Sequence, residues 1–211
     1  MERSRDEIKI TSVKYDKKYK SYAIYSDGEM ILGIIDDTLL YFTEIFAGNT
    51  IERKLITEII KYDQRARAYR DATAQLMRGM KTEIELKRKL VKMTYTDDAI
   101  DFAISKCKDN GYLNDEEYIR AYVERYASTR GAIRMKYELK QKGVDERLLK
   151  DICDDKESAR ELAVKFYNKK SDDPKVKEKY IRYMMSKGFE YDTAMRIYDE
   201  VKDNVDGVDE K

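Results

Sequence analysis

A lysine followed by a glycine and an apolar residue marks a helix that ends in a left-handed turn, and this signature constrains the fold most. Lys142-Gly143-Val144 matches Lys187-Gly188-Phe189 at an offset of 45 residues, and the apolar positions around the two copies agree as well. A fainter copy lies 49 residues upstream, with Thr94 in place of the glycine. A period in the mid-forties, with room for three helices in each unit, is typical of helical repeat proteins.

The repeat predicts a mainly α-helical fold, with three tandem three-helix repeats in an elongated, curved array, preceded by a small N-terminal β piece. We expect the β piece and a short helix in residues 1–49, repeats in residues 50–110, 111–155 and 156–203, and a frayed tail in residues 204–211. Gly48-Asn49 suggests the first boundary, and apolar periodicity ends near Asp203.

The N-terminal part reads as strands rather than helices. Short alternation of apolar and polar residues indicates strands over residues 8–12, 22–25 and 30–35. Asp27-Gly28 is a strong hairpin signal between the second and third strands, so we expect a three-stranded sheet. A helix from about Asp37 to Phe46 should follow. The piece is too small to be stable alone and should pack on the helical array.

From Thr50 onward the pattern is helical. Two apolar stripes slip out of register near Lys61, so either a helix break or one helix with two buried faces fits the sequence. Thr82-Glu83-Ile84-Glu85 has the form of a capping box. Asp173-Pro174 should open a helix as its cap and first helical residue. In the middle repeat we expect helices over residues 114–128, 131–141 and 145–154.

Composition argues against catalysis. The sequence has no histidine and no glycine-rich phosphate loop, and its two isolated cysteines cannot form a zinc site. The acidic pairs Asp36-Asp37 and Asp97-Asp98 lie where helices should begin, so we interpret them as helix-terminal charges. We therefore predict that the chain is not an enzyme and needs neither a cofactor nor a metal.

Cysteine usage and hydropathy bear on the compartment. Cys107 and Cys153 fall on apolar-periodic helix positions, so we interpret both as reduced core residues of a cytoplasmic protein. The sequence shows no long apolar run and no signal-like N-terminus. We expect a soluble chain that is not exported and does not bind membranes.

Charge is nearly balanced overall but not locally. The chain has 43 basic and 42 acidic residues, yet the stretch from Lys61 to Lys92 has ten basic residues against four acidic ones. A solvated helix face or a surface for an acidic partner would each explain this excess. As partner contacts we favour Arg65, Arg67, Arg70, Arg88 and Lys89 from the first repeat, with Arg130 and Arg134 from the second.

Tyrosine is abundant, with 18 copies. Tyr118, Tyr122 and Tyr126 lie four residues apart on one predicted helix. They would stack bases of single-stranded nucleic acid if they faced a basic groove, or form a core stripe with hydroxyls at its rim. The helical spacing favours the core stripe.

One motif carries a family resemblance. Gly111 is placed to end one helix, and Asn114 to cap the next. The motif comprises Gly111, Tyr112, Leu113, Asn114, Asp115, Gly131, Leu139, Gly143 and Gly188. At these residues the chain resembles the RecX family, the bacterial regulators of the RecA recombinase, with Thr94 and Ile119 as departures from the usual pattern. Most motif residues fall at helix ends or in the core, so they identify a fold rather than a contact surface.

The resemblance implies a regulatory protein of recombination, DNA repair and the SOS response. It implies a monomer that binds the RecA filament on single-stranded DNA, with room for a weak direct DNA contact, and inhibits the recombinase, ATPase and coprotease activities of RecA. The alternative is a helical-repeat protein that contacts single-stranded DNA directly. For the first function, reversing Arg67, Arg70 and Arg88 to glutamate should preserve helical content and slow association with filaments.

Overall fold

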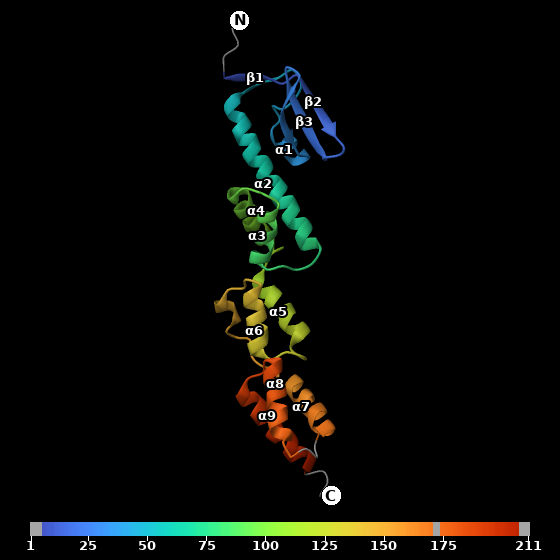
Figure 1. Cartoon of the computed structure of the whole chain (residues 1–211). Coiled ribbons are helices and arrows are strands. Elements are labelled where there is room, and N and C mark those ends of the chain that lie inside the picture. Colours follow the sequence, from blue (N-terminus) through green and yellow to red (C-terminus); the bar gives the residue numbers. More distant parts are fainter. Residues whose placement is uncertain (1–5, 171–173, 207–211) are drawn as a thin grey trace. The chain divides into compact units, whose positions relative to one another are not determined.

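The structure, a computed structural model, describes residues 6–170 and 174–206. The described chain is mostly helical, with strands in its N-terminal part and helical repeats after them, so the predicted fold class is confirmed. The chain folds as two compact units (Figure 1). The first comprises the described residues up to Lys81 together with Glu85–Leu113, and the second comprises Thr82–Ile84 with the described residues from Asn114 onward.

The strands of the first unit form two small sheets. Strands β2 (Ser12–Asp16), β3 (Ser21–Ser26) and β4 (Glu29–Ile34) make a three-stranded antiparallel sheet, in which β3 and β4 correspond to the second and third predicted strands. The predicted Asp27-Gly28 hairpin joins β3 to β4, and both of its residues have positive φ, as a tight two-residue turn requires. The first predicted strand, residues 8–12, is wrong as a member of this sheet, because only Ser12 lies in β2. Strand β1 (Glu7–Lys9) instead pairs with β5 (Thr50–Glu52), which lies where the sequence predicted helix.

Helix α1 (Asp36–Tyr41) is shorter than the predicted helix, which was expected to reach Phe46. The chain leaves the helix at Phe42 because Phe42 and Ile45 are buried in the core beside the sheet. Asp63 holds the start of α1 from a distance, since its Oδ1 accepts from Ile35 N and Thr38 Oγ1, both at 2.8 Å.

Helix α2 (Arg53–Met77) runs without a break through the slip in apolar register. Of the two alternatives left open by the sequence, the structure has one helix with two buried faces. Ile59 belongs to the core beneath the sheet, whereas Ala68 and Ala72 belong to a separate core shared with the following helices. The slip near Lys61 therefore marks the point where α2 changes packing partners.

Helices α3 (Glu83–Lys92) and α4 (Asp97–Asp109) complete the first repeat. Within the first unit, α4 packs along the second half of α2 (Figure 1). Thr96 caps α4 by accepting from Ala99 N, and Cys107 is fully buried on its inner face. The capping-box threonine has a further contact, because Thr82 Oγ1 donates to Lys142 O at 2.6 Å within the second unit.

In the middle repeat the third predicted helix is wrong. Helices α5 (Asp115–Tyr126) and α6 (Ala132–Gln141) form as expected, but residues 145–154 contain only one 3-10 turn, η1 (Glu146–Leu149). Leu149 and Ile152 both turn into the core, and the chain then delivers the buried Asp154 to two backbone N–H groups. Cys153, predicted to be a core residue, is exposed between these inward-facing side chains.

The last repeat comprises α7 (Lys156–Lys170), α8 (Val176–Lys187) and α9 (Tyr191–Asp206). Pro174 lies in the turn before α8 and is not its first helical residue, while Asp173 lies outside the described residues. Helix α9 runs to Asp206, three residues beyond the predicted end of the last repeat at residue 203. Residues 207–211 lie outside the described part.

Candidate interaction surfaces and repeat junctions

Three of the motif glycines end helices in the predicted way. Gly111, Gly143 and Gly188 have φ values of 71°, 84° and 86°. After each glycine the next N–H reaches back five residues, as in Val144 N to Leu139 O at 3.1 Å, which is a Schellman turn. Thr94 occupies the equivalent position of the first repeat with φ 63°, so three aligned positions share one backbone conformation.

Asn114 is the predicted helix cap. Its Oδ1 accepts from Glu116 N at 2.9 Å and from Glu117 N at 3.2 Å, and three acidic residues follow in the first turn of α5. In the first unit, Leu113 is buried in the core, while Tyr112 exposes 58% of its surface. These motif residues therefore shape the chain, and Tyr112 is accessible for a contact.

Two of the glycines lie against neighbouring backbone or side chains within the second unit. A β-carbon at Gly131 would overlap the backbone nitrogen of Phe189, and Gly131 N donates to Lys187 O at 3.0 Å. A β-carbon at Gly143 would lie 2.5 Å from the β-carbon of Ile84. Close packing therefore requires glycine at both positions, and at Gly143 the positive φ requires it as well.

Asp115 and Asp154 hold equivalent helix N-termini. Asp115 Oδ1 accepts from Glu83 N at 2.9 Å, at the first residue of α3. Asp154 Oδ1 accepts from Ala132 N at 2.6 Å, at the first residue of α6, and its Oδ2 accepts from Glu190 N at 2.8 Å. Each carboxylate precedes or opens the first helix of a repeat and satisfies the second helix of the preceding one.

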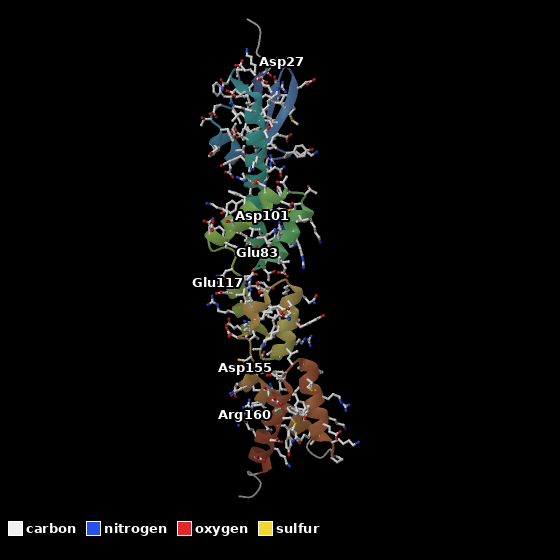
Figure 2. All side chains as sticks on the ribbon, turned by 90° about the vertical axis from the view of Figure 1, so that its left-hand side faces the viewer. Asp27, Glu83, Asp101, Glu117, Asp155 and Arg160 are labelled. Atoms are coloured by element: carbon white, nitrogen blue, oxygen red, sulfur yellow. The ribbon has the colours of Figure 1, made fainter. Side chains whose placement is uncertain are left out.

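The sequence signal for Asp154 was missed. Its neighbour Asp155, labelled in Figure 2, is a conventional cap. It accepts from Glu157 N at 3.0 Å and from Ser158 Oγ at 2.9 Å. When two aspartates precede a helix, one carboxylate is sufficient to cap it, and the other has no hydrogen-bond donor nearby in the sequence. The second aspartate therefore indicates a carboxylate that accepts hydrogen bonds from residues distant in the sequence.

Two of the predicted partner contacts, Arg65 and Arg67, are engaged within the first unit. Arg65 forms a two-point ion pair with Asp98, at 2.7 Å from Nε and 2.6 Å from Nη2, and this hydrogen bonding lowers the pKa of Asp98 to about 2. Arg67 Nε pairs with the buried Asp63 at 2.5 Å, and its Nη2 donates to Gly33 O at 3.0 Å. Arg67 therefore ties α2 to β4, and reversing its charge would disturb the fold.

Arg130 and Arg134 converge on Glu138 in the second unit. Arg130 Nη1 lies 2.5 Å from Glu138 Oε2, and Arg134 Nε lies 3.0 Å from Oε1. Tyr122 donates its hydroxyl to the same carboxylate, and burial together with this hydrogen bond raises its pKa to about 12. Burial opposes the charge on Glu138, but the hydrogen bonds from Tyr122 and Arg134 and the charge of Arg130 outweigh it and lower the pKa of Glu138.

Three of the predicted cations remain accessible. Arg70 on α2 and Arg88 and Lys89 on α3 are exposed, and within the described part of the chain none of them forms an ion pair. All three belong to the first unit. They are the members of the predicted set whose charge is available to a partner.

The tyrosine stripe is part of the core. Tyr122 exposes 8% of its surface, and Tyr118 and Tyr126 pack against the same cluster. The guanidinium carbon of Arg130 lies 3.9 Å from the centre of the Tyr126 ring, so the polar rim is also occupied. The core-stripe interpretation is confirmed.

Within residues 6–170 and 174–206, no group of histidine, cysteine, aspartate or glutamate side chains is arranged to hold a metal ion. In the same ranges, no helix combines the length and the apolar composition that crossing a membrane requires.

Comparison with known proteins places these junctions in a family. Residues 114–151 match the second three-helix domain of RecX, and residues 154–197 match its third three-helix domain. The first match begins at Asn114, the cap of α5. The second begins at Asp154, whose carboxylate accepts from Ala132 N at the start of α6. The matched segments thus start at two of the residues that organise the repeats.

Relatives that match nearly the whole of this chain are also regulatory proteins RecX. The chain is 32% identical to a regulatory protein RecX of Clostridium perfringens over 207 residues, covering 93% of this chain and 97% of the relative. It is 26% identical to a regulatory protein RecX of Limosilactobacillus reuteri, covering 93% and 76%.

A crystal structure of a regulatory protein RecX superposes with a TM-score of 0.71 at 25% identity, covering 93% of this chain and 99% of that one. RecX from Lactobacillus salivarius gives a TM-score of 0.63 at 27% identity, covering 67% and 98%.

Proposed function

The chain belongs to the RecX family, and we propose that it regulates a RecA-type recombinase by binding the filament that the recombinase forms on single-stranded DNA. Membership across nearly the whole chain is the observation that carries this proposal. The bound protein inhibits the strand exchange, the ATP hydrolysis and the coprotease activity of the filament. It acts by binding and has no catalytic activity of its own.

The accessible charges fit such a partner. Arg70, Arg88 and Lys89 give the first unit positive charge that no internal ion pair neutralises in the described chain. A filament on DNA presents phosphates and acidic protein surface, so these cations would speed encounter and set register more than they would add affinity.

The test is a titration of the chain into RecA that hydrolyses ATP on single-stranded DNA. The rate of hydrolysis should fall as the chain is added and level off at a fixed ratio of chain to RecA. A rate that stays constant, under conditions where the chain remains folded, would contradict the proposal.

A second measurement distinguishes direct binding to DNA from recognition of the recombinase in the filament. The chain is added to bare single-stranded DNA and to filament at the same salt concentration, and binding is followed by fluorescence anisotropy. Binding that depends on phosphates alone falls steeply with salt on both targets. Filament binding that persists where bare-DNA binding has been lost supports recognition of the protein component.

A further inference from the structure

A groove of about 680 Å³ lies in the second unit between α5 and the segment that contains η1. Its apolar wall is formed by Ile119, Val123, Leu148 and Ile152, and Cys153 lies beside them. Its charged rim is formed by Glu116, Arg120, Glu124, Arg147 and Asp151. None of these residues takes part in the repeat junctions described above.

The groove exists because the middle repeat lacks a full third helix. In the first repeat the 13-residue helix α4 packs along α2, and in the last repeat the 16-residue helix α9 packs along α7. The corresponding element η1 has four residues. It leaves Glu116, Arg120, Val123 and Glu124 uncovered, which share one face of α5 at helical spacing. The two flanking repeats therefore indicate that a helix fits against this face.

The free charge at the rim is negative. Arg147 Nη2 pairs with Asp145 at 2.5 Å, and Arg120 Nη2 lies 3.9 Å from Glu117. In the described chain, the side chains of Glu116, Glu124 and Asp151 form no ion pair. An occupant that complements this rim carries lysine or arginine beside its apolar stripe.

We propose that this α5 groove binds an amphipathic helix of the protein partner, with an apolar stripe toward Val123 and Leu148 and basic residues toward Glu116, Glu124 and Asp151. The bound helix takes the place that α4 and α9 occupy in the other repeats. This inference rests on the proposed function, in which the partner is the recombinase filament. Single-stranded DNA does not fit, because the acidic rim repels phosphates.

Cys153 reports occupancy of the groove. It is exposed at the wall, whereas Cys107 is fully buried, and burial raises the pKa of the Cys107 thiol to about 11. A maleimide therefore reacts selectively with Cys153 in the intact chain. Saturating RecA filament on single-stranded DNA should slow this alkylation roughly tenfold, as expected for a contact that excludes water from the groove.

The outcomes separate the two proposals. If the chain cosediments with filament and Cys153 is alkylated at the unbound rate, the groove proposal is overturned and the proposed function stands. If the chain does not cosediment with filament at all, both are overturned. Protection by bare single-stranded DNA alone would identify the occupant as nucleic acid and would also overturn the groove proposal.

Two substitutions with equal exposure test the apolar wall. Leu148 lines the groove and Val164 lies on α7 outside it, and each exposes 37% of its surface. Leu148→Asp should weaken filament affinity roughly tenfold, whereas Val164→Asp should leave it within about twofold. Circular dichroism establishes that both variants are folded. Equal affinities of the two folded variants would overturn the proposal.

The rim is tested by neutralisation. Replacing Glu116 and Glu124 with glutamine and Asp151 with asparagine removes the free negative charge while keeping side-chain size. The association rate with filament at low salt should fall several-fold, because the basic helix is no longer attracted. A faster association rate would show that the partner presents acidic groups here and would overturn the proposal.

Discussion

Thr94 holds a backbone conformation that costs a β-branched residue free energy. Its φ is 63°, in the left-handed region, where the aligned positions carry Gly143 and Gly188. The conformation persists because the turn between α3 and α4 must bring Tyr95 back against the core. The Thr94 hydroxyl offers little compensation, since among the described residues it donates only to the adjacent Met93 O. The first repeat therefore tolerates strain that the other two avoid.

Thr94→Gly should accordingly stabilise the first unit by about 1 kcal/mol, because glycine adopts positive φ without a steric penalty. Urea unfolding of parent and variant measures the difference. Thr94→Ala is the control for loss of the hydroxyl, and it should give little or no gain because alanine keeps the β-carbon. A variant with glycine that is no more stable than the one with alanine would contradict the strain argument.

Glu138, another single residue, contributes to the stability of the fold in a pH-dependent way. Its pKa in the folded chain lies below the ordinary value of 4.5, so the ionised group stabilises the fold above pH 4.5. This contribution is lost as the pH falls through the lowered pKa. Glu138→Gln should cost on the order of 1 kcal/mol at pH 7, and the gap between parent and variant should close under acid conditions.

A matched control is Glu146, which pairs with Lys140 at 2.7 Å but exposes 73% of its side chain. Glu146→Gln should change stability little at any pH, because solvent screens exposed ion pairs. Thermal unfolding of parent and both variants between pH 3 and pH 7 makes the comparison. Parallel curves for Glu138→Gln and the parent would contradict the argument.

At the scale of elements, Asp115 at the start of α5 and Asp154 before α7 each accept a hydrogen bond from the N-terminus of a helix in the preceding repeat. Asp154→Ala should destabilise the second unit by about 2–3 kcal/mol, because a buried N–H group at the start of α6 and a partly buried one before α9 lose their acceptor. Asp155→Ala is the control, since it removes only the cap of α7 and should cost about 1 kcal/mol. Denaturant unfolding followed by helical circular dichroism compares them, and equal losses would show that Asp154 is an ordinary cap.

The sequence predicted an element well where neighbouring residues alone determine its structure. The Asp27-Gly28 hairpin and the Asn114 cap each follow from a few adjacent residues. The third helix of the middle repeat could not be predicted in this way, because residues 145–154 have helical periodicity but tertiary contacts of Ile152 and Asp154 set the backbone. Likewise, the unbroken α2 depends on two separate cores that receive its two faces.

At the scale of the whole molecule, local charge density identified a basic region but not which charges are free. Arg65 pairs with Asp98, 33 residues away, and Arg67 holds Asp63 and the carbonyl of Gly33. Such partners are invisible to a count of charges along the sequence. Reversing the charge of Arg67 would therefore disturb the fold instead of testing a partner contact. Of the predicted contacts, Arg70, Arg88 and Lys89 are the accessible ones.

Reversing Arg70, Arg88 and Lys89 to glutamate should therefore slow association with the recombinase filament roughly tenfold at low salt, because three accessible positive charges of the first unit become negative. Helical content should not change, since within the described residues none of the three side chains forms an ion pair. The difference from the parent should narrow as salt is raised and the interaction is screened.

The matched control reverses Lys150, Lys156 and Arg160, which are exposed residues of the second unit (Arg160 is labelled in Figure 2), and changes the net charge by the same amount. Stopped-flow association at two salt concentrations compares the two triple variants with the parent. If both variants slow association equally, net charge alone steers the encounter. If only the control is slow, the steering surface lies on the second unit, on the same unit as the α5 groove. Only a selective loss in the Arg70, Arg88 and Lys89 variant supports a docking role for the first unit, because only that result places the effective charge on the first unit.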